Sequence, residues 1–164
     1  MNNVQSFLRL IRNPFKFRFF LLSRLPAAWF SRIRLYAIDE QTAVVTVPYG
    51  WFSKNPFKST YFACLAMAAE MSTGLLAMMQ AAGRQPAVSM LVIGMEATYF
   101  KKATGITFFT CSNGNDLREA VEKAVTTGEA QSFRALSTGV NQQGEKIADF
   151  HITWSFKQKS KPAG

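Results

Sequence analysis

A lone carboxylate interrupts a long apolar stretch of this chain. From Ser59 to Gly83 the sequence reads STYFACLAMAAEMSTGLLAMMQAAG, and Glu70 is its only charged residue. An ionised carboxylate in apolar surroundings loses its hydration, so it needs a partner, a raised pKa or a chemical role. A carboxylate whose pKa is raised towards neutrality is a better general base. Glu70 is therefore the first candidate for a functional residue.

The stretch around Glu70 has the length and composition of one helix. Residues three, four and seven positions away share its helical face, and most of them are small: Ala63, Ala66, Met67, Thr73, Gly74 and Ala77. A face of small residues allows another backbone to approach closely, as when a sheet curls around a helix. A membrane span would instead place Glu70 near the bilayer centre, at a cost of about 3 kcal/mol. We therefore expect a core helix wrapped by a sheet.

The remaining apolar segments have the pattern of strands. They are rich in Val, Ile, Phe and Thr, and the last one alternates apolar with polar residues. Strands are expected within 35–49 (with a turn at 39–41), 88–99, 106–111, 131–141 and 146–156. A second, shorter helix is expected after Asn113, with Gly128 at its end.

The N-terminal segment is basic and rich in aromatic residues. Seven basic residues and no acidic residue precede Asp39, and the net charge of the chain is +9. Pro14 and Pro26 divide residues 6–34 into short helices. Three interpretations are open: a strap packed on the core, a membrane-surface helix, or a contact for nucleic acid or phosphate. Phe-rich helices usually bury their Phe side chains, which favours the strap.

Composition excludes several classes of protein. Apolar residues make up 48% of the chain and charged residues 18%, which is typical of a globular rather than a disordered protein. Two cysteines, Cys64 and Cys111, are too few for a disulfide framework and are expected as buried thiols. One histidine, His151, leaves no metal-ligand cluster, so we expect no metal and no cofactor. The lack of a clear signal peptide favours the cytoplasm.

The spacing around Glu70 resembles the active-site segment of PaaI-like acyl-CoA thioesterases. Those enzymes carry an Asn, then His-Gly-Gly at the start of a helix, then an Asp or Glu within it. Here Asn55 precedes Tyr61 by six residues and Tyr61 precedes Glu70 by nine, which are the intervals of that family. Tyr61-Phe62-Ala63 stands in place of His-Gly-Gly. In this respect, and in its basic N-terminal lead, the chain is similar to the DUF4442 family of hotdog proteins.

The resemblance implies an α+β hotdog fold in a single domain. Its curved antiparallel sheet of about five or six strands would wrap one long apolar helix, with a second short helix beside it. Residues 1–34 would form a basic N-terminal helical strap and residues 35–164 the hotdog domain. Proteins of this kind usually form homodimers or dimers of dimers, with sites at the subunit interface.

The implied activity is hydrolysis of an acyl thioester, carried by CoA or by acyl carrier protein. If the roles of the matching residues in those enzymes apply to this chain, Glu70 is the general base or nucleophile, and Asn55 orients substrate or water. Backbone N–H groups at Tyr61, Phe62 and Ala63 become the oxyanion donors, assisted by the helix dipole.

Two other hypotheses remain. Phe62 and Ala63 carry side chains where the enzymes have glycines, which motivates a non-catalytic acyl- or acyl-CoA-binding hotdog protein. The third hypothesis is a membrane-surface or nucleic-acid-binding module in the basic N-terminus, with a peripheral membrane contact expected more readily than nucleic acid. Glu96 either faces the site or pairs with Lys101 or Lys102, and His151 is expected to face solvent.

Overall fold

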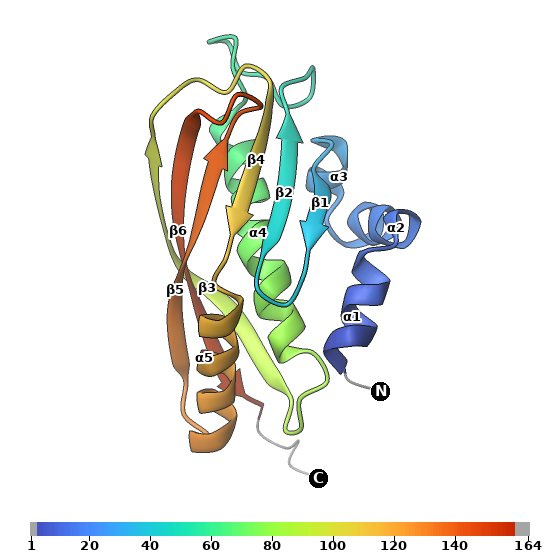
Figure 1. Ribbon diagram of the computed structural model, residues 1–164, viewed down its shortest axis with the longest axis vertical. Coiled ribbons are helices and arrows are strands. Elements are labelled where there is room, and N and C mark those ends of the chain that lie inside the picture. Colours follow the sequence, from blue (N-terminus) through green and yellow to red (C-terminus); the bar gives the residue numbers. More distant parts are fainter. Residues whose placement is uncertain (1–2, 160–164) are drawn as a thin grey trace.

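An antiparallel sheet curves around one long helix, α4 (Phe62–Ala81), in the computed structural model, which describes residues 3–159 (Figure 1). The described residues form six strands in the spatial order β1-β2-β4-β5-β6-β3. These are β1 (Arg34–Ile38), β2 (Ala43–Pro48), β3 (Val88–Tyr99), β4 (Ile106–Cys111), β5 (Gln131–Val140) and β6 (Lys146–Gln158). The other helices are α1 (Asn3–Ile11), α2 (Pro14–Arg24), α3 (Pro26–Phe30) and α5 (Gly114–Thr127). The expected curved sheet around one apolar helix is confirmed.

Helix α4 is the core of the molecule. It lies behind the sheet in Figure 1 and contacts every strand from β2 to β6 as well as α1, α3 and α5. Its middle, from Met71 to Ala77, is buried on all sides, as expected of a helix that is apolar all round. Among the described residues it is the one helix long and apolar enough to cross a membrane, but most of it is buried inside the protein.

The helix begins three residues later than the apolar stretch suggests. Residues 55–60 form a loop instead, and the N–H of Tyr61 donates to the carbonyl of Ser53 at 2.7 Å. Tyr61 is the N-cap, with extended backbone angles of φ −61° and ψ 133°, so its side chain stands at the mouth of the helix. Phe62 is consequently the first helical residue.

Strands β6 and β3 form the side of the sheet nearest Glu70. The apolar residues of β6 point to the inner face and are buried: Ile147, Ala148, Phe150, Ile152, Trp154 and Phe156. Strand β3 pairs with β6 alone and is therefore an edge strand of the sheet. A register shift between Val92 and Gly94 interrupts its alternation, and this bulge decides which residues of β3 face inwards.

The N-terminal helices form the predicted strap along one face only. Asn13 caps α2 by accepting from the N–H of Lys16 at 3.1 Å, and Phe17 and Leu21 are buried against the core. On the opposite face, Phe15 and Phe19 remain 86% and 72% exposed. The expectation that this segment buries its Phe side chains is thus wrong for half of α2, because the helix is apolar on both faces.

Candidate functional site

Glu70 lies in the middle of α4, where the strap and the β3–β6 side of the sheet meet. Its carboxylate borders an apolar gap of about 60 Å³ and has no hydrogen bond or ion pair to any residue that the structure describes. The gap is lined by residues from three directions: Phe17, Phe20 and Leu25 from the strap, Met71, Gly74, Leu75 and Met78 from α4, and Met90 and Trp154 from the sheet. Burial raises the pKa of Glu70 above the ordinary value of a glutamic acid.

Trp154 fixes the helix beside this carboxylate. Its indole ring packs against Gly74, where an added Cβ would lie 3.2 Å from the ring and 3.2 Å from Oε1 of Glu70. The indole N–H donates to Oγ1 of Thr73 at 2.9 Å, and that hydroxyl donates to the backbone carbonyl of Glu70 at 3.0 Å. The ring is buried, so its only polar atom is satisfied and the position of Glu70 relative to β6 is held.

A larger cleft of about 530 Å³ opens at the start of α4. It is lined by the loop and first turn of the helix on one side (Asn55, Pro56, Phe57, Ser59, Thr60, Tyr61, Phe62 and Leu65) and by the end of β3 and the segment after it on the other (Tyr99 to Ala103). Its lining is mostly apolar, with two lysines, Lys101 and Lys102, as the charged residues. The volume is that of a small-molecule site.

The first turn of α4, next to this cleft, has backbone N–H groups that donate no hydrogen bond within the part of the chain that the structure describes. The N–H groups of Phe62 and Ala63 have no acceptor among the described residues, whereas the N–H of Cys64 donates to the carbonyl of Tyr61. Free N–H groups at a helix N-terminus, together with the helix dipole, attract negative charge. Tyr61 and Phe62 pack edge to face at 4.8 Å and are about half exposed beside these donors.

Asn55 organises the loop that forms one wall of the cleft. Its Oδ1 accepts from the N–H of Phe57 at 3.0 Å, the N–H of Ser59 at 3.2 Å and the hydroxyl of Ser59 at 3.2 Å. Its Nδ2 donates to the carbonyl of Thr60 at 3.4 Å. The amide is therefore engaged with the loop itself, and this network holds the chain in place just before Tyr61.

An uncovered apolar strip joins the start of α4 to Glu70. On the helix it consists of Ala63, Ala66 and Met67, which are half-buried. On β3, Met95 and Tyr99 lie opposite Ile152 and Ala148, so they share the inner face with these buried residues but remain 44% and 48% exposed.

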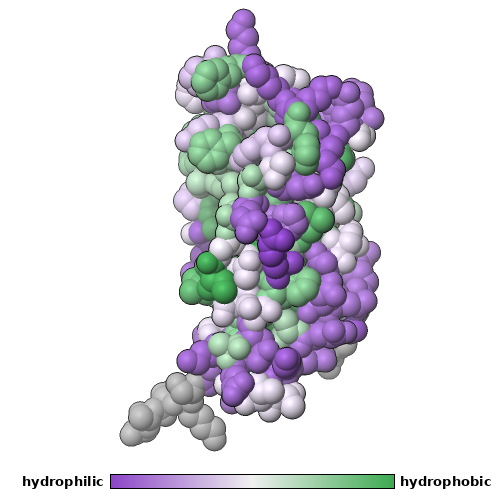
Figure 2. All heavy atoms as spheres, turned by 90° about the vertical axis from the view of Figure 1, so that its left-hand side faces the viewer, coloured by the Kyte–Doolittle hydropathy of each residue, from purple (hydrophilic) through white to green (hydrophobic). Residues whose placement is uncertain are grey.

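The strip is open because β3 is the last strand of the sheet. Figure 2 faces the side of the molecule on which the second half of β3 lies, and several apolar patches are exposed there among polar residues. A long edge strand with exposed apolar residues is a surface that proteins normally cover.

Residues 16–156 match the family described as Domain of unknown function (DUF4442). This chain is a member of the DUF4442 family.

Solved structures resemble this DUF4442 protein over most of its length. A Pseudomonas aeruginosa protein of unknown function, named a probable thioesterase, superposes with a TM-score of 0.74 at 17% identity, covering 89% of this chain and 97% of that one. A thioesterase from Haemophilus influenzae gives 0.62 at 11% identity, with 87% and 90% covered. The Escherichia coli PaaI protein from the phenylacetic acid degradation operon gives 0.61 at 14%, with 92% and 96% covered. These likenesses confirm the hotdog fold.

Among curated proteins, none matched this sequence.

The DUF4442 protein brings some of the predicted residues together and separates others. Asn55, Tyr61 and Phe62 line one cleft, and the N–H of Ala63 lies in the same helical turn. Glu70 is eight residues after Phe62, about 12 Å along the helix axis, and borders a different cavity. Within one copy of the chain, therefore, the carboxylate does not share a cleft with the N–H groups of the helix start.

Several residues near the site were not predicted from the sequence. Trp154 and Thr73 form the contact that positions Glu70, and Tyr99 and Lys101 line the cleft from the far end of β3. The alternation of β6 already indicated that Trp154 points inwards, but its partner on α4 depends on how the two elements pack.

Two weaker candidates lie elsewhere. Glu96 neither faces the site nor pairs with Lys101 or Lys102: its Oε2 accepts from Arg134 at 2.6 Å on the outer face of the sheet. His151, expected to face solvent, is on that same outer face but half-buried. Cys64 and Cys111 are buried and free, as expected.

Proposed function

We propose that this protein hydrolyses an acyl thioester, such as an acyl-CoA, with Glu70 as general base or nucleophile. The observation that carries the proposal is the unpartnered carboxylate of Glu70, whose pKa is raised by burial, on the helix whose first turn has two free N–H groups. The hotdog fold and its likeness to proteins named as thioesterases support the same reaction class.

In the proposed reaction Glu70 takes a proton from water, and the resulting hydroxide attacks the thioester carbonyl. The N–H groups of Phe62 and Ala63 stabilise the negative charge that develops on the carbonyl oxygen. The carbon–sulfur bond then breaks, and the thiolate leaves with the proton returned by Glu70. Asn55 contributes by holding the loop before Tyr61, which keeps one wall of the cleft in place.

We further propose that the functional unit is a homodimer in which two copies pair through β3 and the strip on α4. The strip on the helix runs from Ala63 to Glu70, so its midpoint lies between Ala66 and Met67. A two-fold axis through that midpoint would make the two helices antiparallel and set Glu70 of one subunit opposite Ala63 of the other. This pairing would unite a carboxylate with the free N–H groups that lie about 12 Å away in its own subunit.

The cleft supplies features that suit the rest of the substrate. Its apolar walls would take the acyl chain or pantetheine arm, and the ammonium groups of Lys101 and Lys102 at its edge would meet phosphates. Lys101 pairs with Glu145 at 2.6 Å across an exposed surface, a contact that phosphate can replace at little cost. We also propose that the protein works in the cytoplasm, where thiols such as those of Cys64 and Cys111 stay reduced.

A panel of acyl-CoA thioesters, assayed by release of free thiol, tests the proposal. We expect hydrolysis by the wild type and a fall in kcat of about 100-fold or more in Glu70→Ala, the range for loss of a general base. Glu119→Ala removes an exposed carboxylate on α5 and is the matched control. Wild-type activity in a folded Glu70→Ala protein would exclude the assigned role.

One observation favours a second candidate function, a protein that binds acyl thioesters without cleaving them. The rings of Tyr61 and Phe62 stand beside the free N–H groups, where glycines would leave the approach to the helix start open. Binding of acyl-CoA by calorimetry, with no thiol released over the whole panel, would select this function instead.

A further inference from the structure

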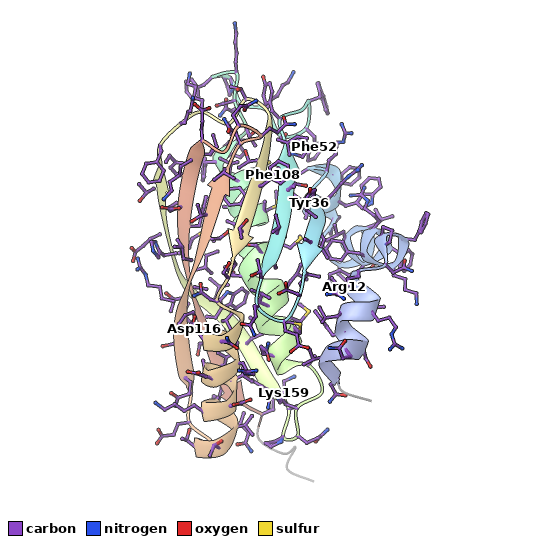
Figure 3. All side chains as sticks on the ribbon, in the orientation of Figure 1. Arg12, Tyr36, Phe52, Phe108, Asp116 and Lys159 are labelled. Atoms are coloured by element: carbon purple, nitrogen blue, oxygen red, sulfur yellow. The ribbon has the colours of Figure 1, made fainter. Side chains whose placement is uncertain are left out.

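The outer face of α2 is an apolar surface with nothing packed on it. One stripe of the helix carries Phe15, Phe19 and Leu22, which are spaced four and three residues apart. They are 86%, 72% and 45% exposed, while Phe17 and Leu21 on the opposite stripe are buried. Figure 1 shows α2 as the outermost element on its side of the molecule, and side chains project from it away from the sheet in Figure 3.

Exposed cations lie on the strap and next to it. Lys16 and Arg24 belong to α2 itself, Arg9 lies on α1, and Arg32 and Arg34 follow α3; all five are exposed. No acidic residue occurs between residues 3 and 38. The first two acids after this segment are already engaged: Asp39 accepts from the N–H of Gln41 at 2.8 Å, and Glu40 accepts from the side chain of Gln5 at 2.8 Å.

The positive charge is concentrated enough for the arginines to affect each other. Arg18 lies over the ring of Trp29 at 4.8 Å, and its pKa is lowered by burial and then by the neighbouring charges of Arg34 and Arg32. An uncompensated cluster of this kind attracts an anionic partner.

Exposed aromatic residues continue beside α2. Phe30 at the end of α3 stacks on Phe52 at 5.6 Å, and both are about half exposed. Trp51, next to Phe52, is 80% exposed. Figure 3 shows Phe52 beside α3, on the same side of the molecule as the strap. Aromatic residues next to cations are typical of segments that lie at the interface of a lipid bilayer.

We propose that the outer face of α2 docks in the plane of an anionic phospholipid surface. Phe15, Phe19 and Leu22 enter the boundary between headgroups and acyl chains, and Lys16, at the edge of this stripe, contacts the phosphates. Apolar residues occupy the centre of the patch and cations its rim, the order of an interfacial helix. A nucleic acid would need cations along the centre to follow its backbone, and Leu22 has no ring on which a base could stack.

A second copy of the chain fits the patch less well than lipid does. Self-association through this face would bring two sets of exposed cations together with no acidic residue from the segment to compensate them. The homodimer proposed above uses β3 and the uncovered strip on α4, which leaves α2 free.

Co-sedimentation with vesicles of phosphatidylcholine, with and without phosphatidylglycerol, tests the docking surface. The wild type should partition onto the anionic vesicles, weakly onto the neutral ones, and less as salt rises. The double substitution Phe15→Ser with Phe19→Ser should weaken partition by at least about tenfold. Tyr36→Ser is the matched control, because Tyr36 is 70% exposed on β1 outside the patch and its loss should leave partition unchanged.

A second pair of variants tests the charges and does not depend on the first. Lys16→Gln should weaken partition about fivefold, the effect of one cation at an anionic surface. Lys123→Gln on α5 removes an exposed cation elsewhere and should have no effect.

Three results would overturn the proposal. The first is a folded wild-type protein that does not bind anionic vesicles, or whose binding survives all the substitutions on α2. The second is a lower molecular mass for the double variant than for the wild type, measured by light scattering. That result would show that the outer face of α2 binds a second copy of the chain. The third is tighter binding of single-stranded DNA than of vesicles in direct competition, lost with the same substitutions.

Discussion

At the scale of single residues, the surroundings of the Glu70 carboxylate determine which of its protonation states is favoured. Most half-buried carboxylates in proteins gain a hydrogen bond or a cation, and the described residues give Glu70 neither. Instead it faces Trp154, Gly74 and the strap. The protonated form of Glu70 is therefore favoured in the folded protein. When Glu70 is ionised, its burial lowers the free energy of unfolding, and no partner offsets this loss.

This loss of stability has a definite pH dependence. Because the pKa of Glu70 is raised in the folded state, the folded protein holds the proton more tightly than the unfolded chain. The free energy of unfolding must then fall as pH rises from about 4.3, the ordinary value for Glu, through the folded pKa. Below that window both states are protonated and the loss vanishes.

We therefore expect Glu70→Gln to unfold at a higher denaturant concentration than the wild type at neutral pH, and the gap to close in acid. Each unit by which the pKa is raised corresponds to about 1.4 kcal/mol at neutral pH. Urea unfolding at a series of pH values measures the difference, with Glu119→Gln as the exposed control. A gap of constant size would show that folding does not shift the pKa of Glu70. A wild type that is the more stable protein at neutral pH would show that Glu70 has a charge-stabilising partner.

At the scale of elements, sequence patterns predict the helices and strands well, because burial of one face sets the spacing of apolar residues along each element. The expected strands 88–99 and 106–111 coincide with β3 and β4. The apolar stretch begins at Ser59, but Asn55 holds Ser59 and Thr60 in a loop, so α4 begins beside Tyr61, where the motif spacing places the helix start. Long-range contacts, which the sequence does not display, decide such boundaries.

The faces of elements were harder to predict than the elements. Strict alternation from Met90 along β3 would put Glu96 on the inner face, but the bulge between Val92 and Gly94 moves it to the outer face. Similarly, α2 is apolar on both sides, so no pattern says which side is buried. The Asn-to-Glu spacing points to Asn55 and Glu70 as candidate site residues, but it does not indicate that Glu70 and the helix start border separate cavities.

The first turn of α4 offers a test of the oxyanion donors. Proline at Phe62 would remove one free N–H while fitting the backbone, since it is the first helical residue and Tyr61 already has extended angles. We expect Phe62→Pro to lower kcat by about 100-fold or more, as for loss of one oxyanion donor. Phe62→Ala removes the ring but keeps the N–H, so it should retain kcat. Equal losses in both variants would assign the effect to the ring and contradict the role of the N–H.

At the scale of the whole molecule, the fold leaves one face incomplete. Strand β3 has no neighbour on its outer edge, and Met95 and Tyr99 on its inner face are exposed although their partners on β6 are buried. The half-buried stripe of α4 continues the same surface up to Glu70. The two-fold partner that we propose would cover this surface and bring together the two halves of the proposed site, so we expect activity only in the dimer.

Mixed dimers test this directly. Subunits carrying Glu70→Ala and subunits carrying Phe62→Pro, each with its own affinity tag, can be coexpressed and purified as heterodimers. If each site joins Glu70 of one subunit to the helix start of the other, one of the two sites in the heterodimer carries both defects and the other carries none. About half of the wild-type activity per dimer should then return, because a two-fold dimer has two equivalent sites.

If Glu70 instead acts with the helix start of its own subunit, every site in the heterodimer carries one defect and activity stays at the level of the single variants. The heterodimer of Glu70→Ala with wild-type subunits is the control, since it should reach about half of full activity under either arrangement. The two heterodimers differ only at Phe62, so half of full activity in both of them, against the low activity of each single-variant homodimer, requires that the active site be shared between subunits.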